Sequence, residues 1–180
     1  MVYVMLGTGF EEVEAITPVD LLRRAGVDVI TVGINGKTVY GGHGIGVVAD
    51  ITIEEIDLSQ MDMIVLPGGL GGVASIRGCK MAMDAIQYAH QEKKYIGAIC
   101  AAPTILAELG ITNDKQAVCY PGCESDMGTA NMQLNCACVT DGHVITGTSA
   151  GCAIPFALSL IRVLTDDAQA DRIASQIVIR

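Results

Sequence analysis

The sequence has no apolar run that reaches the roughly 18 residues of a membrane-spanning helix. Positive charge is also scarce: 11 lysines and arginines stand against 20 acidic residues, which gives a net charge of -9. A nucleic-acid ligand requires a basic face, so this balance argues against one. The first residues lack a basic stretch followed by a small-residue cleavage site, and they indicate a first strand and not a signal peptide. We expect a cytoplasmic protein with no membrane or nucleic-acid partner.

Several cofactor and metal signatures are missing as well. The seven cysteines lack the paired Cys-x-x-Cys spacings of a zinc site, and their odd number implies no disulfide framework in a reducing compartment. The Gly-x-x-x-x-Gly-Lys-Ser/Thr pattern of an ATPase is absent. Residues 7–9 resemble part of a dinucleotide loop, but Glu12 replaces its third glycine and the glutamates around it would repel a pyrophosphate. We therefore expect no metal and no cofactor.

Strand and helix patterns alternate along the chain, which is typical of an open parallel sheet with helices on both faces. Strands are expected at 2–6, 27–33, 38–40, 46–49, 62–66, 95–99, 116–120, 136–140 and 143–147. Helices are expected at 11–25, 79–93, 150–164 and 166–175, with a further helix after Cys100 that stops at Gly110. A chain of 180 residues can bury the core of one domain, which we assign to residues 1–180.

Cys100 is the most informative residue, because an apolar strand at 95–99 runs directly into it and helix-starting residues follow. This places the sulfur on a strand-to-helix elbow, above the carboxyl end of the strand and near a helix N-terminus. The positive end of a helix lowers the pKa of a thiol, so we expect a reactive thiolate. The alternative is a buried structural cysteine, because free cysteines are often buried.

Glu14 is the first candidate partner of Cys100. The loops that follow parallel strands meet at one edge of the sheet, which brings the start of the helix at 11–25 close to the elbow. Pro18 has no N–H to donate to the Glu14 carbonyl, so the helix is expected to kink there. We interpret the kink as aiming Glu14 inward; tolerated local strain is the alternative.

Backbone N–H groups are the second set of candidate partners. Gly68 and Gly69 follow the predicted strand at 62–66 and let the backbone approach a ligand closely. The N–H groups of Gly69 and Ala101 could form an oxyanion hole beside the sulfur. A glycine pair is a weak signal when it stands alone.

Three segments together resemble the DJ-1/PfpI family of the ThiJ/PfpI superfamily. They read GFEEVEAITPVDLLRRAG at 9–26, VLPGG at 65–69 and GAICAAP at 97–103, and the similarity covers essentially the whole chain. The resemblance implies a flavodoxin-like three-layer α/β/α sandwich, a homodimer, and an oxidation-prone Cys100 hydrogen-bonded to a protonated Glu14. It also implies the oxyanion-type N–H groups. Related proteases and amidotransferases carry a histidine directly after the cysteine, where this chain has Ala101, so both activities are disfavoured.

The chain departs from the family pattern at three places. Tyr120 stands before a proline where relatives usually have a histidine; a tyrosine is a poor base at neutral pH but a workable proton donor. Residues 147–151 read GTSAG where relatives carry a Ser-Arg-Gly-Pro-type segment, so an anion-binding arginine is missing. His43 stands where relatives often place an arginine that reaches across the dimer toward the partner's cysteine. A solvated loop histidine is the alternative there.

The resemblance implies a stress-response enzyme of the glyoxalase or deglycase type that acts on small reactive carbonyl compounds, 2-oxoaldehydes such as methylglyoxal. Cys100 would attack the aldehyde, Glu14 would move the proton between adjacent carbons, and the N–H groups of Gly69 and Ala101 would hold the oxyanion. One alternative is a redox sensor in which Cys100 is oxidised without turnover. A chaperone-like binding module is the other.

Overall fold

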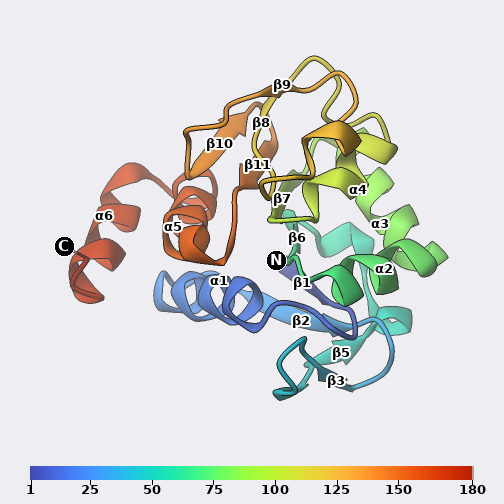
Figure 1. The fold of residues 1–180 in the computed structure, drawn as a ribbon. Helices are drawn as coiled ribbons and strands as arrows, with labels where there is room; N and C mark the ends of the chain where they lie inside the picture. The colour runs from blue at the N-terminus through green and yellow to red at the C-terminus, as the bar shows by residue number, and fades with distance from the viewer. Residues whose placement is uncertain (180) are drawn as a thin grey trace.

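A seven-stranded sheet forms the middle layer of the molecule in the computed structural model, which describes residues 1–179 (Figure 1). In sheet order the strands are β10 (Cys138–Asp141), β11 (Val144–Gly147), β7 (Tyr95–Ile99), β6 (Met63–Leu66), β1 (Val2–Leu6), β2 (Val29–Gly33) and β5 (Ile51–Thr52). Neighbouring strands pair in parallel except β10 and β11, which form an antiparallel hairpin. The predicted mostly parallel sheet is confirmed.

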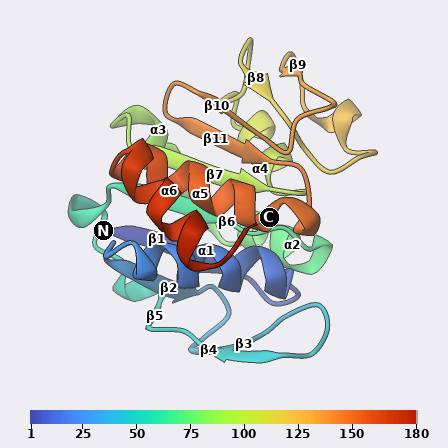
Figure 2. The ribbon, with the colours of Figure 1, turned by 90° about the vertical axis from the view of Figure 1, so that its left-hand side faces the viewer.

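Helices cover both faces of this sheet. They are α1 (Glu12–Arg24), α2 (Leu70–Gly78), α3 (Lys80–Gln91), α4 (Pro103–Glu108), α5 (Ala153–Leu164) and α6 (Asp167–Gln176). One layer contains α1, α5 and α6, which pack against one another, and the other contains α2, α3 and α4 (Figures 1 and 2). This arrangement confirms the predicted flavodoxin-like three-layer sandwich. The predicted domain ends at residue 180, which lies outside the described residues.

The two faces of β1 show why the central strands read as continuous apolar runs. Val2, Val4 and Leu6 pack into the cluster shared with α1 and α5, whereas Tyr3 and Met5 pack into the cluster on the opposite face. A strand that is buried on both faces has no polar side to alternate with. The longest described helix is α1 with 13 residues, which is too short to cross a bilayer.

Two small sheets lie outside the central one. The antiparallel pair β3 (Thr38–Tyr40) and β4 (Gly46–Val48) forms the predicted hairpin-like excursion after β2. The parallel pair β8 (Gln116–Ala117) and β9 (Asn131–Met132) lies near the β10 end of the sandwich (Figure 1).

The predicted strand at 116–120 is wrong beyond Ala117. The Val118 N–H donates to the Thr146 hydroxyl at 2.9 Å, and the Tyr120 N–H donates to the Cys100 carbonyl at 2.7 Å. The acceptors are a side-chain hydroxyl and the carbonyl of the elbow, so these two donors do not form a ladder with a neighbouring strand. Pro121 has no N–H to continue one. The chain beyond β8 consequently becomes a loop that is held against the Cys100 elbow.

Candidate active site

The strand-to-helix elbow at Cys100 is present as predicted. Strand β7 ends at Ile99, Cys100 has a φ of 66°, and α4 begins at Pro103. A left-handed backbone at a residue other than glycine costs on the order of 1–3 kcal/mol and is frequent at functional sites. The Cys100 N–H donates to the Gly147 carbonyl at 2.9 Å, which fixes the elbow to the end of β11. The thiol is thereby held at the carboxyl edge of the sheet.

Glu14 points from α1 into the protein toward this thiol. Its side chain is completely buried, and its Oε2 accepts the Gly68 N–H at 2.9 Å. Within residues 1–179, Oε1 has no hydrogen-bond partner of good geometry, and the Cys100 thiol is the neighbouring group that interacts with this carboxyl. Helix α1 continues through Pro18 without interruption. The inward placement of Glu14 is as the sequence predicts.

Burial governs the protonation of the two groups. It raises the pKa of Glu14 to about 7. Burial and the adjacent Glu14 carboxylate raise the pKa of the Cys100 thiol to about 12, against the weaker opposing effect of the Ala101 and Gly69 N–H groups. The predicted lowering of the Cys100 pKa is therefore wrong, because burial and the Glu14 carboxylate outweigh the Ala101 and Gly69 N–H groups, and the six-residue helix α4 begins only at Pro103.

The pair therefore loses one proton, that of Glu14, as the pH rises through about 7. Below about pH 7 Glu14 is protonated, and above it the carboxylate lies beside a neutral thiol; the upward shift of the pKa is in the predicted direction. A carboxylate in this position can take the thiol proton as the sulfur attacks an electrophile. The site can therefore generate its nucleophile during the reaction without a resident thiolate.

A pocket of about 300 Å³ opens at the sulfur, and we call it the Cys100 pocket. It is lined by Glu11, Gly69, Leu70, Cys100, Ala101, Tyr120 and Cys123. Glycine is required on one wall: Gly69 has a φ of 83°, and a Cβ there would lie 2.5 Å from the Gly9 carbonyl oxygen. A Cβ on Gly68 would lie 2.6 Å from the Cys100 Cβ. The close backbone approach keeps the Gly69 N–H beside the sulfur.

Tyr120 lies in the wall of the Cys100 pocket, joined to Cys100 by the backbone hydrogen bond described above. Its side chain is 49% exposed, so the ring is at the rim and not in the core. That the hydroxyl is directed at the sulfur or at a reacting oxygen stays a prediction.

His43 does not line the Cys100 pocket. Its Nδ1 lies 2.9 Å from Glu12 Oε2, and its backbone N–H donates to Glu12 Oε1 at 2.8 Å. The hydrogen bond to Glu12 raises the pKa of His43, and the charge of Glu11 acts in the same direction. Within its own chain the imidazole is thus held by the first turn of α1. The contact across a dimer stays a prediction.

The sequence did not lead us to predict that Cys123 lines the Cys100 pocket. It follows Tyr120 by three residues, and the Cys123 N–H donates to the Tyr120 carbonyl at 2.9 Å. The intervening Pro121-Gly122 dipeptide is a turn signal that could have indicated this reversal of the chain.

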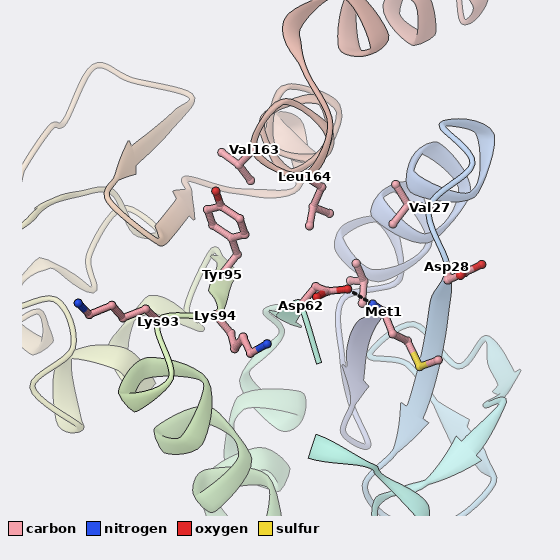
Figure 3. A pocket seen from close by; sticks show the side chains of 10 residues that line it. Met1, Val27, Asp28, Asp62, Lys93, Lys94, Tyr95, Val163 and Leu164 are labelled. Carbon is pink, nitrogen blue, oxygen red and sulfur yellow. Dashed lines mark hydrogen bonds and ion pairs between the residues drawn. The ribbon is translucent and has the colours of Figure 1, made fainter. Parts of the chain in front are cut away.

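A second hollow, of about 420 Å³, lies at the amino ends of the strands (Figure 3). Tyr95 begins β7 there, with Val163 and Leu164 nearby, and the Met1 amino group pairs with Asp62. The residues described as lining it include no cysteine, serine or histidine. We therefore place the chemistry at the opposite edge of the sheet, where Cys100 lies.

Known proteins that resemble this chain share its fold over most of its length. The sequence model of the DJ-1/PfpI family matches residues 1–163. Protein dj-1beta of Drosophila melanogaster is 31% identical over 178 residues, 98% of this chain and 95% of the relative. The crystal structure of Drosophila melanogaster DJ-1beta matches with a TM-score of 0.94 and 31% identity, covering 99% of this chain and 97% of that one. A Pyrococcus horikoshii protein named a deglycase is 30% identical over 138 residues, 76% of this chain and 82% of the relative.

Proposed function

The chain belongs to the DJ-1/PfpI family, and from that premise we propose that it is a cofactor-independent enzyme that converts 2-oxoaldehydes such as methylglyoxal through Cys100. The observation that carries the proposal is the fully buried Glu14 carboxyl beside the strained Cys100 elbow. The archaeal relative named a deglycase supports a related chemistry. Seven free thiols suit a reducing compartment, and we place the protein in the cytoplasm as part of a stress response.

In the first step the Cys100 sulfur attacks the aldehyde carbon of methylglyoxal. A C–S bond forms, the thiol proton moves to the Glu14 carboxylate, and the carbonyl electron pair moves to oxygen. We assign the stabilisation of the developing oxyanion to the N–H groups of Gly69 and Ala101, because both act on the Cys100 sulfur. Transfer of the Glu14 proton to this oxygen gives a neutral hemithioacetal and restores the carboxylate.

In the second step Glu14 removes the hydrogen from the former aldehyde carbon. The electron pair forms a carbon–carbon double bond, and the electron pair of the adjacent ketone moves to its oxygen, which gives an enediolate. Glu14 then returns the proton to the adjacent carbon, while the hydroxyl proton on the former aldehyde carbon passes to the enediolate oxygen, which leaves a thioester of lactate on Cys100. Water hydrolyses the thioester, so that methylglyoxal and water give lactate and the free thiol.

Lactate formation from methylglyoxal by the purified protein tests this proposal. The wild type should form lactate in proportion to protein concentration. A Cys136→Ala variant should keep the activity, because Cys136 is exposed and is not among the residues that line the Cys100 pocket. A folded wild-type protein that forms no lactate above the uncatalysed background would exclude the proposed reaction.

We assign Tyr120 the role of a proton donor to the reacting oxygen. Tyr120→Phe removes only the hydroxyl and should lower turnover on the order of 10²-fold, the effect expected of one positioned acid. Steady-state lactate formation measures it, with Tyr120→His as the comparison. If Tyr120→Phe has the turnover of the wild type and Tyr120→His gains activity, Tyr120 has no role in the mechanism, and a redox role for Cys100 is favoured.

The second candidate function is a redox sensor, which the surroundings of the sulfur favour. Oxygen atoms added to Cys100 would meet the Gly69 and Ala101 N–H groups and a protonated Glu14, each of which can donate a hydrogen bond. Intact mass after mild peroxide treatment tests this role. Addition of oxygen at Cys100 without any lactate formation would favour the sensor over the enzyme.

We further propose that the protein is a homodimer, with His43 directed toward the partner's site. The face formed by α1 and α5 leaves Ile16 and Ile154 exposed around a hollow of about 420 Å³ that Ile177 also lines. Apolar groups gathered in this way are typical of an interface. Light scattering should give twice the mass of one chain, and Ile16→Lys should give a monomer. A monomeric wild type would refute both the dimer and the role of His43.

A further inference from the structure

The Cys100 pocket contains a second thiol that the proposed reaction does not use. Cys100 and Cys123 both line it, although 23 positions separate them in the chain. Cys123 directly precedes a short 3-10 turn, η3 (Glu124–Asp126). Tyr120 connects the two cysteines through backbone hydrogen bonds, one to the Cys100 carbonyl at 2.7 Å and one from the Cys123 N–H at 2.9 Å. The backbones of the two cysteines are thus joined through Tyr120, and both residues line the same pocket.

The turn that precedes Cys123 is exposed, although Cys123 itself packs against two core clusters. Pro121 and Gly122 are exposed, and Gly122 has a φ of 99°, so its backbone has access to conformations that other residues rarely adopt. A disulfide requires two Cα atoms about 4.4–6.8 Å apart. Displacement of the exposed 120–123 turn toward the elbow would supply this approach, because the pocket between them is open space.

Cys119 is a natural control, because it lies near Cys123, which packs against the same small cluster, but does not line the Cys100 pocket. It is 5% exposed, packs with Met127, and lines a different hollow with Val118 and Leu134. It is not among the residues that line the Cys100 pocket. Of the thiols described, only Cys123 shares that pocket with Cys100.

We propose that Cys123 is a resolving thiol, which converts Cys100 oxidised by a small hydroperoxide into a Cys100–Cys123 disulfide. The Cys100 sulfur attacks the outer oxygen of the hydroperoxide, the O–O bond breaks, and an alcohol or water leaves while the sulfur becomes a sulfenic acid. The Cys123 sulfur then attacks the Cys100 sulfur, an S–S bond forms, and the hydroxyl leaves as water with the Cys123 proton. Two thiols are oxidised and one peroxide is reduced.

The disulfide would protect the site chemically. A sulfenic acid that meets no thiol is oxidised further to a sulfinic acid, which ordinary thiols do not reduce, whereas a disulfide is reversed by thiol exchange. Burial raises the pKa of Cys123, and the neighbouring Asp126 and Glu124 act in the same direction, against the weaker opposing charge of Arg77. Because the thiolate is the attacking form, the yield of disulfide relative to sulfinate should increase with pH.

Intact mass and non-reducing peptide mapping after treatment with one equivalent of hydrogen peroxide test the proposal. Trypsin places Cys100 in residues 95–115 and Cys123 in residues 116–162, so the disulfide joins these two peptides. The wild type and Cys119→Ser should both lose two hydrogen atoms and yield the joined peptide. Cys123→Ser should yield no joined peptide and instead gain one oxygen atom at Cys100 with one equivalent of peroxide, and two oxygen atoms when a second equivalent is added.

Absence of the joined peptide from the wild type, or its presence in Cys123→Ser, would overturn the proposal. The inference requires a reactive Cys100 but no turnover of an aldehyde, so its failure is distinguishable from that of the proposed function. A protein that forms lactate but no disulfide refutes only the role of Cys123. A protein that forms the disulfide but no lactate refutes only the enzymatic role.

Discussion

Replacing Cys100 with alanine is expected to lower lactate formation from methylglyoxal by about 10³-fold or more, to a level near the uncatalysed rate. The reason is chemical: without the sulfur no C–S bond forms, and the hydrogen on the aldehyde carbon is never made acidic in a bound hemithioacetal. The remaining N–H groups and Glu14 have no covalent intermediate on which to act.

The fold should survive this change, because alanine adopts the left-handed backbone of position 100 at a cost similar to that of cysteine. Circular dichroism and the urea midpoint provide the check on folding. Cys136→Ala is the matched control, since it removes an exposed thiol outside the pocket. Retention of more than a tenth of the wild-type rate by folded Cys100→Ala would show that the sulfur is not the nucleophile.

Replacing Glu14 with glutamine is expected to have two opposite effects. Turnover should decrease by about 10²–10⁴-fold, because an amide cannot accept the thiol proton or the carbon-bound hydrogen. Stability should increase above neutral pH, because glutamine buries no charge and its side-chain oxygen can still accept the Gly68 N–H. Loss of activity together with a gain of stability distinguishes a catalytic carboxyl from a structural one.

The pH dependence of that stability gain follows from the raised pKa. In the folded protein Glu14 keeps its proton up to about pH 7, whereas in the unfolded chain it loses the proton near its ordinary pKa of 4.5. The stability due to the protonated carboxyl is therefore complete below pH 4.5 and is lost as the pH rises through about 7. Above that range the free energy of unfolding of Glu14→Gln should exceed that of the wild type by roughly 3 kcal/mol, at 1.36 kcal/mol for each pKa unit.

Urea unfolding of the wild type and Glu14→Gln at pH 5 and pH 8 measures this difference. The free energies of unfolding of the two proteins should differ much more at pH 8 than at pH 5. An equal difference in the free energy of unfolding at both pH values would mean that the Glu14 pKa is not raised, and would leave the carboxyl ionised throughout.

The elements that carry the site were predictable from local patterns. The apolar run at 95–99 followed by Cys100 predicted the elbow, and the rule that parallel strands share a carboxyl edge placed Glu14 and Gly69 near it. Burial on both faces explains why the central strands read as continuous apolar segments. These features depend on residues close in sequence and on the regular geometry of the sheet.

Two features were not predictable, because they depend on three-dimensional contacts. The pKa of Cys100 is raised by burial and by a carboxylate 86 positions away, and the sequence pattern near Cys100 reports only the helix that follows it. Strand β8 ends at Ala117 because the next backbone donors find partners on β11 and at the elbow. The same contacts bring Cys123 into the pocket, which a search for paired cysteine spacings does not detect.

The dependence of kcat/KM on pH for lactate formation tests most directly whether Glu14 and Cys100 act as one pair. If the Glu14 carboxylate takes the thiol proton, the wild-type value should rise as the pH passes through about 7, the raised pKa of Glu14. The remaining activity of Glu14→Gln should lack this rise. A wild-type profile that is flat between pH 6 and 8, or the same rise in Glu14→Gln, would contradict the role of Glu14 as the base that activates Cys100.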